Sequence, residues 1–164
     1  MVPAVAVVCA TLLIATLARI DAPDDGSALA GSGGLPAGRE AGEWIEANVP
    51  DGSAVMTIGP SMANLVQFYG HRRAYGLSVS PNPLNRNPSY EPLPNPDQAL
   101  RDSEVQYVVW DTFSAGRSEK FSRRLLRYAE RYNGRAVHVE ALAASTASGR
   151  RAERPAIVVY KVRP

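Results

Sequence analysis

The chain has 164 residues, of which 45% are hydrophobic and 21% charged, and its 18 basic and 16 acidic residues leave a formal net charge of +2. Such a balance gives no overall field of the kind that draws a protein to nucleic acid, so we expect no nucleic-acid partner. The single cysteine, Cys9, lies in an apolar run, which leaves the rest of the chain without a disulfide or a cysteine metal site.

The first segment is a run of 17 uncharged residues, Val2 to Ala18. As a helix it would be roughly 26 Å long, close to the thickness of a bilayer core. We therefore predict a transmembrane helix over residues 1–20, with membrane lipid as its partner. A cleaved signal peptide is an alternative, because Ala28-Leu29-Ala30 resembles a cleavage site, and a buried helix is a third. Both a span and a signal peptide place the remainder outside the cytoplasm, in the first case as the extracytoplasmic part of a single-pass cell-membrane protein.

Residues 21–38 are rich in Gly, Ala, Ser and Asp and have no apolar period, so they are interpreted as a flexible linker. Residues 39–164 then form one domain of ordinary size. Apolar spacing, capping residues and turn signals predict its elements in chain order: helix 39–49, strand 54–58, helix 60–69, strand 73–79, helix 96–101, strand 105–110, helix 121–132, and strands 136–142 and 156–162.

Strands that alternate with helices favour parallel pairing, and the last two strands favour an antiparallel edge. The predicted fold is a three-layer α/β domain with a mixed, mostly parallel sheet of about five strands.

Ligands of open α/β sheets gather at the carboxyl ends of the strands. Ser61 follows the first strand and lies at the start of a helix, where free backbone N–H groups can hold an anion. A plain strand-to-helix turn is the alternative. Asp111 ends the strongest strand and is the leading acidic candidate for chemistry, although an Asp in this position also commonly caps the next turn.

The segment from Ser80 to Pro96 contains six prolines and is the most distinctive part of the chain. Prolines and asparagines should give it a fixed shape. Arg86, Asn87 and Tyr90 are its candidate substrate-binding residues, for a sugar hydroxyl or a phosphate. In the alternative interpretation the loop is merely stiffened by proline and packs under Leu84 and Tyr90.

Other chemical signatures are missing from the sequence. His71 and His138 are far apart and belong to no cluster with metal-ligand spacing, so we predict no metal and no cofactor, and no catalytic residue is assigned. Basic residues gather at 71–73, on helix 117–131 and near residues 150–154. These clusters are typical of solvated faces, but beside a bilayer they could also contact anionic headgroups or a lipid-linked phosphate.

Several motifs together resemble a known family: Glu43-Trp44-Ile45, Asn48-Val49-Pro50, Gly59-Pro60-Ser61, Phe68-Tyr69-Gly70, Asn87-Pro88-Ser89-Tyr90, Asn95-Pro96-Asp97 and Tyr107-Val108-Val109-Trp110-Asp111. The chain resembles the C-terminal extracytoplasmic domain of polytopic bacterial glycosyltransferases of the protein-mannosyltransferase-like type, which use a polyprenyl-phosphate-linked sugar. The most specific part of the resemblance runs from Phe68 to Asp111.

The resemblance implies a domain that helps to bind a glycan acceptor or a polyprenyl-phosphate sugar beside the membrane portion of such an enzyme. The family's catalytic carboxylate lies in an early loop between membrane helices, and this chain has only one possible span, so no catalytic residue carries over. The alternative is a stand-alone membrane-anchored extracytoplasmic binding or interaction module without catalysis. A third hypothesis is an exported hydrolase that uses Asp111 with His71.

Overall fold

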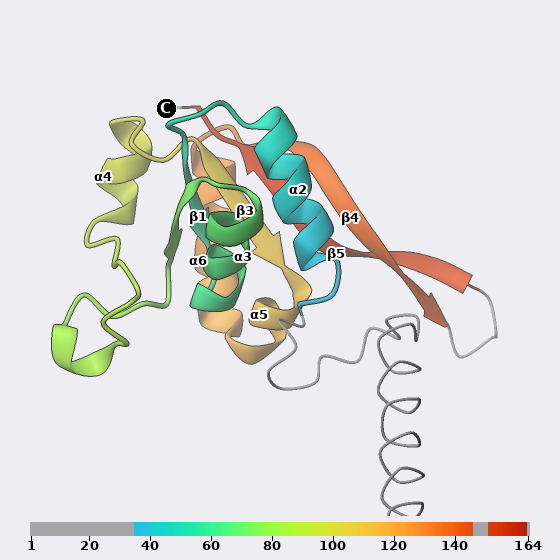
Figure 1. Cartoon of the computed structure of the whole chain (residues 1–164), viewed down its shortest axis with the longest axis horizontal. Coiled ribbons are helices and arrows are strands. Elements are labelled where there is room, and N and C mark those ends of the chain that lie inside the picture. Colours follow the sequence, from blue (N-terminus) through green and yellow to red (C-terminus); the bar gives the residue numbers. More distant parts are fainter. Residues whose placement is uncertain (1–34, 146–150, 164) are drawn as a thin grey trace, which may run out of the picture.

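The computed structural model describes residues 35–145 and 151–163 and contains a five-stranded sheet in the order β2-β1-β3-β5-β4 (Figure 1). Its strands are β1 (Ala54–Thr57), β2 (Arg73–Gly76), β3 (Tyr107–Asp111), β4 (Arg135–Ser145) and β5 (Arg151–Lys161). β2, β1 and β3 are parallel, whereas β5 pairs antiparallel with both β3 and β4. The predicted mixed α/β sheet of five strands is confirmed, with parallel pairing confined to one end.

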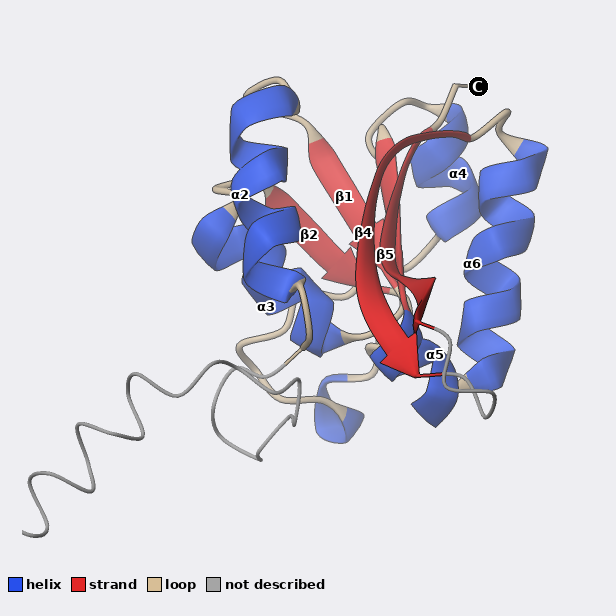
Figure 2. Ribbon diagram, turned by 90° about the vertical axis from the view of Figure 1, so that its right-hand side faces the viewer, coloured by secondary structure: helices blue, strands red, loops and turns tan. Residues whose placement is uncertain are grey.

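Helices cover both faces of this sheet (Figure 2). On one face lie α2 (Gly38–Asn48) and α3 (Pro60–Tyr69), and on the other α4 (Pro96–Arg101) and α6 (Glu119–Arg131). The short α5 (Thr112–Arg117) follows β3, and the 3₁₀ turn η1 (Pro83–Asn85) lies in the loop after β2. Each face has its own apolar core, with Ile45, Val66 and Val109 in one and Met56, Val108 and Leu125 in the other.

Local signals explain where most elements begin and end. Pro60 occupies the first turn of α3, where a missing N–H costs nothing, and Gly70 follows its last residue. The side chain of Asn95 accepts a hydrogen bond from the Gln98 N–H and caps α4 as predicted. β2 ends at Gly76, three residues earlier than expected, because the chain turns there and the Val79 N–H donates to the Gly76 carbonyl.

Arg72 is not part of a solvated basic cluster, although its neighbours His71 and Arg73 are exposed. Its guanidinium is buried and donates hydrogen bonds to backbone carbonyls at the ends of two helices, among them Val49 after α2 and Gly70 after α3. Arg72 thereby supplies hydrogen-bond donors to backbone carbonyls that have no donor within their own helix. Arg72 is thus a structural residue that fastens α2 to α3.

The predicted transmembrane helix at 1–20 and most of the predicted linker at 21–38 lie outside the described residues. Leu35, the first residue described, is already buried in the core on the α2 side. Within 35–145 and 151–163, we find no helix with both the length and the apolar character needed to cross a bilayer.

Candidate functional site

The carboxyl edge of the parallel strands brings the loops singled out in the sequence to one side of the domain. From β1 the chain moves to β2 on one side and then to β3 on the other. β1 and β3 therefore flank a topological switch point, the position where open α/β sheets most often bind ligands. Gly59-Pro60-Ser61, the loop after β2 and Asp111 all lie at this edge, as the sequence predicted for parallel neighbours.

Asp111 is fully buried and caps α5. Its Oδ1 accepts a hydrogen bond from the Ser114 backbone N–H at 2.6 Å. Its Oδ2 is also buried and has no hydrogen-bond partner among the described residues. Burial raises the pKa of this carboxyl, and the hydrogen bonds from Ser114 offset only part of that effect. Asp111 therefore caps α5, as the alternative interpretation of the sequence expected, and does not face solvent as an acid.

The side-chain hydroxyls of Ser78 and Ser114 both lie close to Gly59, which follows the end of β1. A Cβ at position 59 would lie 3.5 Å from Ser114 Oγ and 3.6 Å from Ser78 Oγ. The Thr57 hydroxyl is buried and donates to the Gly59 carbonyl at 2.8 Å. Small side chains at these positions let the α3 and α5 turns approach each other closely. Ser78 and Ser114 could not be paired from the sequence, because their proximity depends on the strand order.

Tyr90, in the loop after β2, lies against the first turns of α3. Together with Ser89 and Glu91 it lines a crevice against Pro60 and Ala63 of about 10 Å³. A crevice of this size holds about one water molecule and not a sugar ring. Ser61 itself is exposed on the first turn of α3. The structure thus brings Tyr90 to the helix turn that carries Ser61, while Asp111 stays beneath the surface.

Arg86 and Asn87 make local bonds within the loop. Arg86 Nη1 donates to the Pro81 carbonyl at 2.9 Å, and Asn87 Oδ1 accepts from the Ser89 N–H and hydroxyl at 3.0 and 2.8 Å. These contacts fix the shape of the loop, as its prolines and asparagines predicted. Asn87 is exposed and Arg86 is half-buried, so a ligand would meet both from the solvent side of the loop.

The two histidines are not placed for chemistry with Asp111. His71 is exposed in the turn before β2 and lies 3.6 Å from Glu46, whereas Asp111 is at the far end of parallel strands roughly 13 Å long. His138 stacks on Trp44, with ring centroids 4.3 Å apart, and its Nε2 lies 2.6 Å from Glu140 Oε1. The hydrolase hypothesis that paired Asp111 with His71 is therefore wrong. Among the described residues no group of three or more His, Cys, Asp or Glu side chains could hold a metal.

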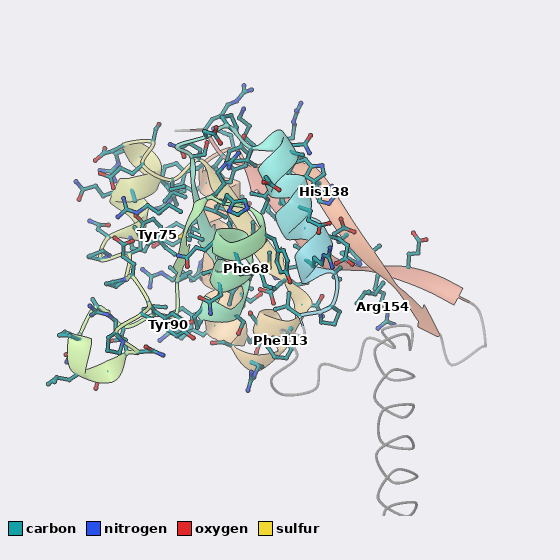
Figure 3. All side chains as sticks on the ribbon, viewed as in Figure 1. Phe68, Tyr75, Tyr90, Phe113, His138 and Arg154 are labelled. Carbon is teal, nitrogen blue, oxygen red and sulfur yellow. The ribbon has the colours of Figure 1, made fainter. Side chains whose placement is uncertain are left out.

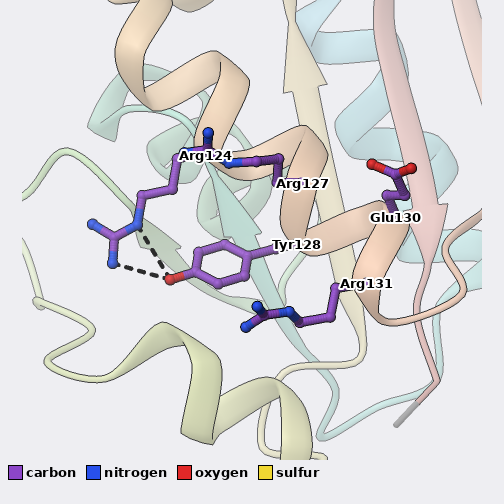
Figure 4. A pocket seen from close by; sticks show the side chains of 5 residues that line it. All are labelled: Arg124, Arg127, Tyr128, Glu130 and Arg131. Carbon is purple, nitrogen blue, oxygen red and sulfur yellow. Dashed lines mark hydrogen bonds between the residues drawn. The ribbon is translucent and has the colours of Figure 1, made fainter.

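A further hollow, of about 540 Å³, lies along α6, the helix whose basic residues were named from the sequence as a possible contact for anionic headgroups (Figure 4). It is lined by Arg124, Arg127, Tyr128, Glu130 and Arg131. Arg124 donates from Nε and Nη2 to the Tyr128 hydroxyl, and Arg131 is paired with Asp97 of α4 at 2.7 Å. The helix carries five basic residues against two acidic ones, so it is locally positive. The basic spacing in the sequence predicted a charged face, and the residues that line the hollow all come from this face of α6.

Comparison with known proteins adds no relative. No family model, no curated protein and no solved structure matches this chain.

Proposed function

We propose that this chain is the C-terminal extracytoplasmic domain, with an adjoining membrane helix at 1–20, of an integral-membrane glycosyltransferase that uses a lipid-phosphate-linked sugar. In this role the domain assists the binding of donor or acceptor and leaves the chemistry to the membrane portion. The resemblance of the motifs between Phe68 and Asp111 supports the choice of family. The unexposed, capping position of Asp111 favours a binding role over a catalytic one.

The observation that carries the proposal is the point at which the chain enters the domain. α2 precedes β1 through a tight turn at 50–53 and runs opposite to it, so α2 begins on the side where β1 ends. Figure 1 shows the blue start of α2 on the same side as α5 and the η1 turn. A membrane helix at 1–20 would thus hold the carboxyl edge, with its candidate loops, toward the bilayer.

The length of the connecting segment agrees with this placement. Residues 21–34 separate the predicted membrane helix from the buried Leu35. A flexible chain of that length has a root-mean-square span of about 20 Å. The loop between β2 and α4 would stay close to the headgroups, where a polyprenyl-phosphate sugar presents its phosphate and sugar. Figure 3 shows Tyr90 and Phe113 toward this side of the domain and His138 toward the other.

The proposal is tested by binding of a radiolabelled short-chain polyprenyl monophosphate to the full chain in detergent micelles. We expect Arg86→Ala and Tyr90→Ala each to weaken binding at least fivefold, because both remove groups from the membrane-facing loop. Arg123→Ala is the matched control, since it removes an exposed basic side chain from α6, away from the loop. Unchanged binding in the two loop variants would reduce the loop to a spacer. Failure of the unaltered chain to bind would favour the stand-alone interaction module.

A further inference from the structure

The η1 turn presents an apolar side chain to solvent. Leu84 is 90% exposed, more than any other large hydrophobic residue in the described part of the chain. Pro81, Asn82, Pro83 and Asn85 around it are exposed as well. A single exposed leucine is ordinary on a protein surface. Two further observations, the rigidity of the turn and its position, distinguish Leu84 from an ordinary exposed leucine.

The turn is held in one shape before any partner arrives. Asn82 Oδ1 accepts a hydrogen bond from the Leu84 N–H, and the Asn85 N–H donates to the Asn82 carbonyl, both at 3.0 Å. Ser80 Oγ accepts from the Asn82 N–H at 3.2 Å. Two prolines restrict the same few residues. Docking of Leu84 therefore needs little additional ordering, which is one of the costs of placing a loop at an interface.

The turn lies at the same edge of the domain as the entry point of the chain. η1, drawn in light green in Figure 1, lies at the outer left corner of the lower, carboxyl edge, and the blue start of α2 lies at the same edge, toward its other end. In Figure 2, α5, which follows the carboxyl end of β3, lies at the lower end of the domain. If residues 1–20 lie in a bilayer, the 14 residues 21–34 keep this corner within reach of its surface.

We propose that Leu84 inserts into the headgroup–acyl boundary of the bilayer that anchors residues 1–20, and that η1 is the second point of membrane contact. The inference rests on the membrane anchoring in the proposed function. A fixed turn with an apolar tip suits this boundary, where amphipathic segments are buried by about 5–10 Å. With the anchor at residues 1–20 and a second contact at η1, the loop after β2 is held facing the lipid headgroups.

The test places an environment-sensitive NBD dye at residue 84 of the full chain, reconstituted in phosphatidylcholine–phosphatidylglycerol vesicles. The background carries Cys9→Ala, so that Leu84→Cys is the only labelled site. Phe68→Cys is the matched control: Phe68 is also apolar and 71% exposed, but lies roughly 12 Å along α3 from the carboxyl edge. The readouts are flotation with the vesicles, the emission maximum, and quenching by lipids brominated in their acyl chains.

We expect flotation, a blue-shifted emission at position 84 and at least threefold stronger bromolipid quenching there than at position 68. Flotation with equal quenching at the two positions would overturn the insertion of Leu84 and leave the proposed function standing. A blue shift at position 84 without bromolipid quenching would mean contact with protein, and would also overturn the insertion. Failure to float with vesicles would overturn both the insertion and the membrane anchoring.

Discussion

Replacement of Arg72 is the sharpest test of how the domain holds α2 in place. The Arg72 guanidinium donates to five backbone carbonyls, those of Glu46, Val49, Pro50, Gly70 and His71. It also lies 2.8 Å from the Asp51 carboxylate. Its side chain is only 7% exposed, so water cannot take over these contacts. Arg72→Met keeps the apolar stem and removes every donor.

The size of the effect follows from the two carbonyls whose bonds are fully buried, Val49 and Gly70. A buried acceptor left without a donor costs about 1–3 kcal/mol, so Arg72→Met should lower the free energy of unfolding by about 2–6 kcal/mol. That is a large part of the ~5–15 kcal/mol that typically stabilises a domain. Arg72→Lys should recover only part of the loss, because one ammonium group cannot reproduce the planar fork of a guanidinium.

The assay is urea unfolding of the full chain in detergent micelles, followed by tryptophan fluorescence from Trp44 and Trp110. Arg73→Met is the matched control, since the Arg73 side chain is 61% exposed and its ion pair with Glu91 lies at the surface. Such pairs contribute about 0–1 kcal/mol. Equal losses for Arg72→Met and Arg73→Met would refute the argument that Arg72 joins the two helix ends.

Two further substitutions, with a glycine control, test burial at the carboxyl edge and packing between α2 and α3. The pKa of Asp111 is raised in the folded protein, so its stabilising contribution is complete at low pH and is lost as the pH rises through the folded value. Asp111→Asn keeps an acceptor for the cap. This variant should gain stability relative to the unaltered chain as the pH is raised from about 4 toward neutral. A difference in urea midpoints that does not change with pH would contradict the argument that Asp111 is buried. Gly42→Ala should destabilise the domain by about 1–3 kcal/mol despite the better helix propensity of Ala, because the new Cβ would lie 2.6 Å from Tyr69 Cβ. Gly116→Ala in α5 is the control: its new Cβ meets no atom within 4 Å, so this variant should be neutral or stabilising by up to ~1 kcal/mol. Equal melting temperatures for the two glycine variants would contradict the close packing of α2 against α3 at Gly42.

Elements with strong local signals could be predicted from the sequence. Pro60 and Gly70 delimit α3, and Asn95 with Pro96 starts α4, because these residues act within a few positions of themselves. α5 was missed, since Thr112–Arg117 has no apolar period and depends on the Asp111 cap at the end of a strand. A capping Asp and a chemically active Asp look alike in the sequence, and only burial separates them.

The remaining differences arise from tertiary contacts. β4 and β5 were expected at 136–142 and 156–162 but extend to Ser145 and begin at Arg151, where the hairpin projects beyond the body of the sheet (Figure 1). The described side chains on either side of this end, Ala141, Leu142, Glu153 and Arg154, are exposed, so they show no alternation of buried and exposed positions that the sequence pattern could have revealed. Arg72 and Arg73 are adjacent and chemically identical, yet one is buried and one exposed because the ends of α2 and α3 meet over Arg72.

Membrane fractionation of the full-length chain tests the central claim most directly. Cells that express it are broken without detergent, and the membranes are washed with alkaline carbonate to strip peripheral proteins. The account predicts that the chain stays in the washed membranes and that protease added to intact spheroplasts digests residues 35–164. Recovery of the chain in the soluble cytosolic fraction, protected from protease until the cells are broken, would contradict it.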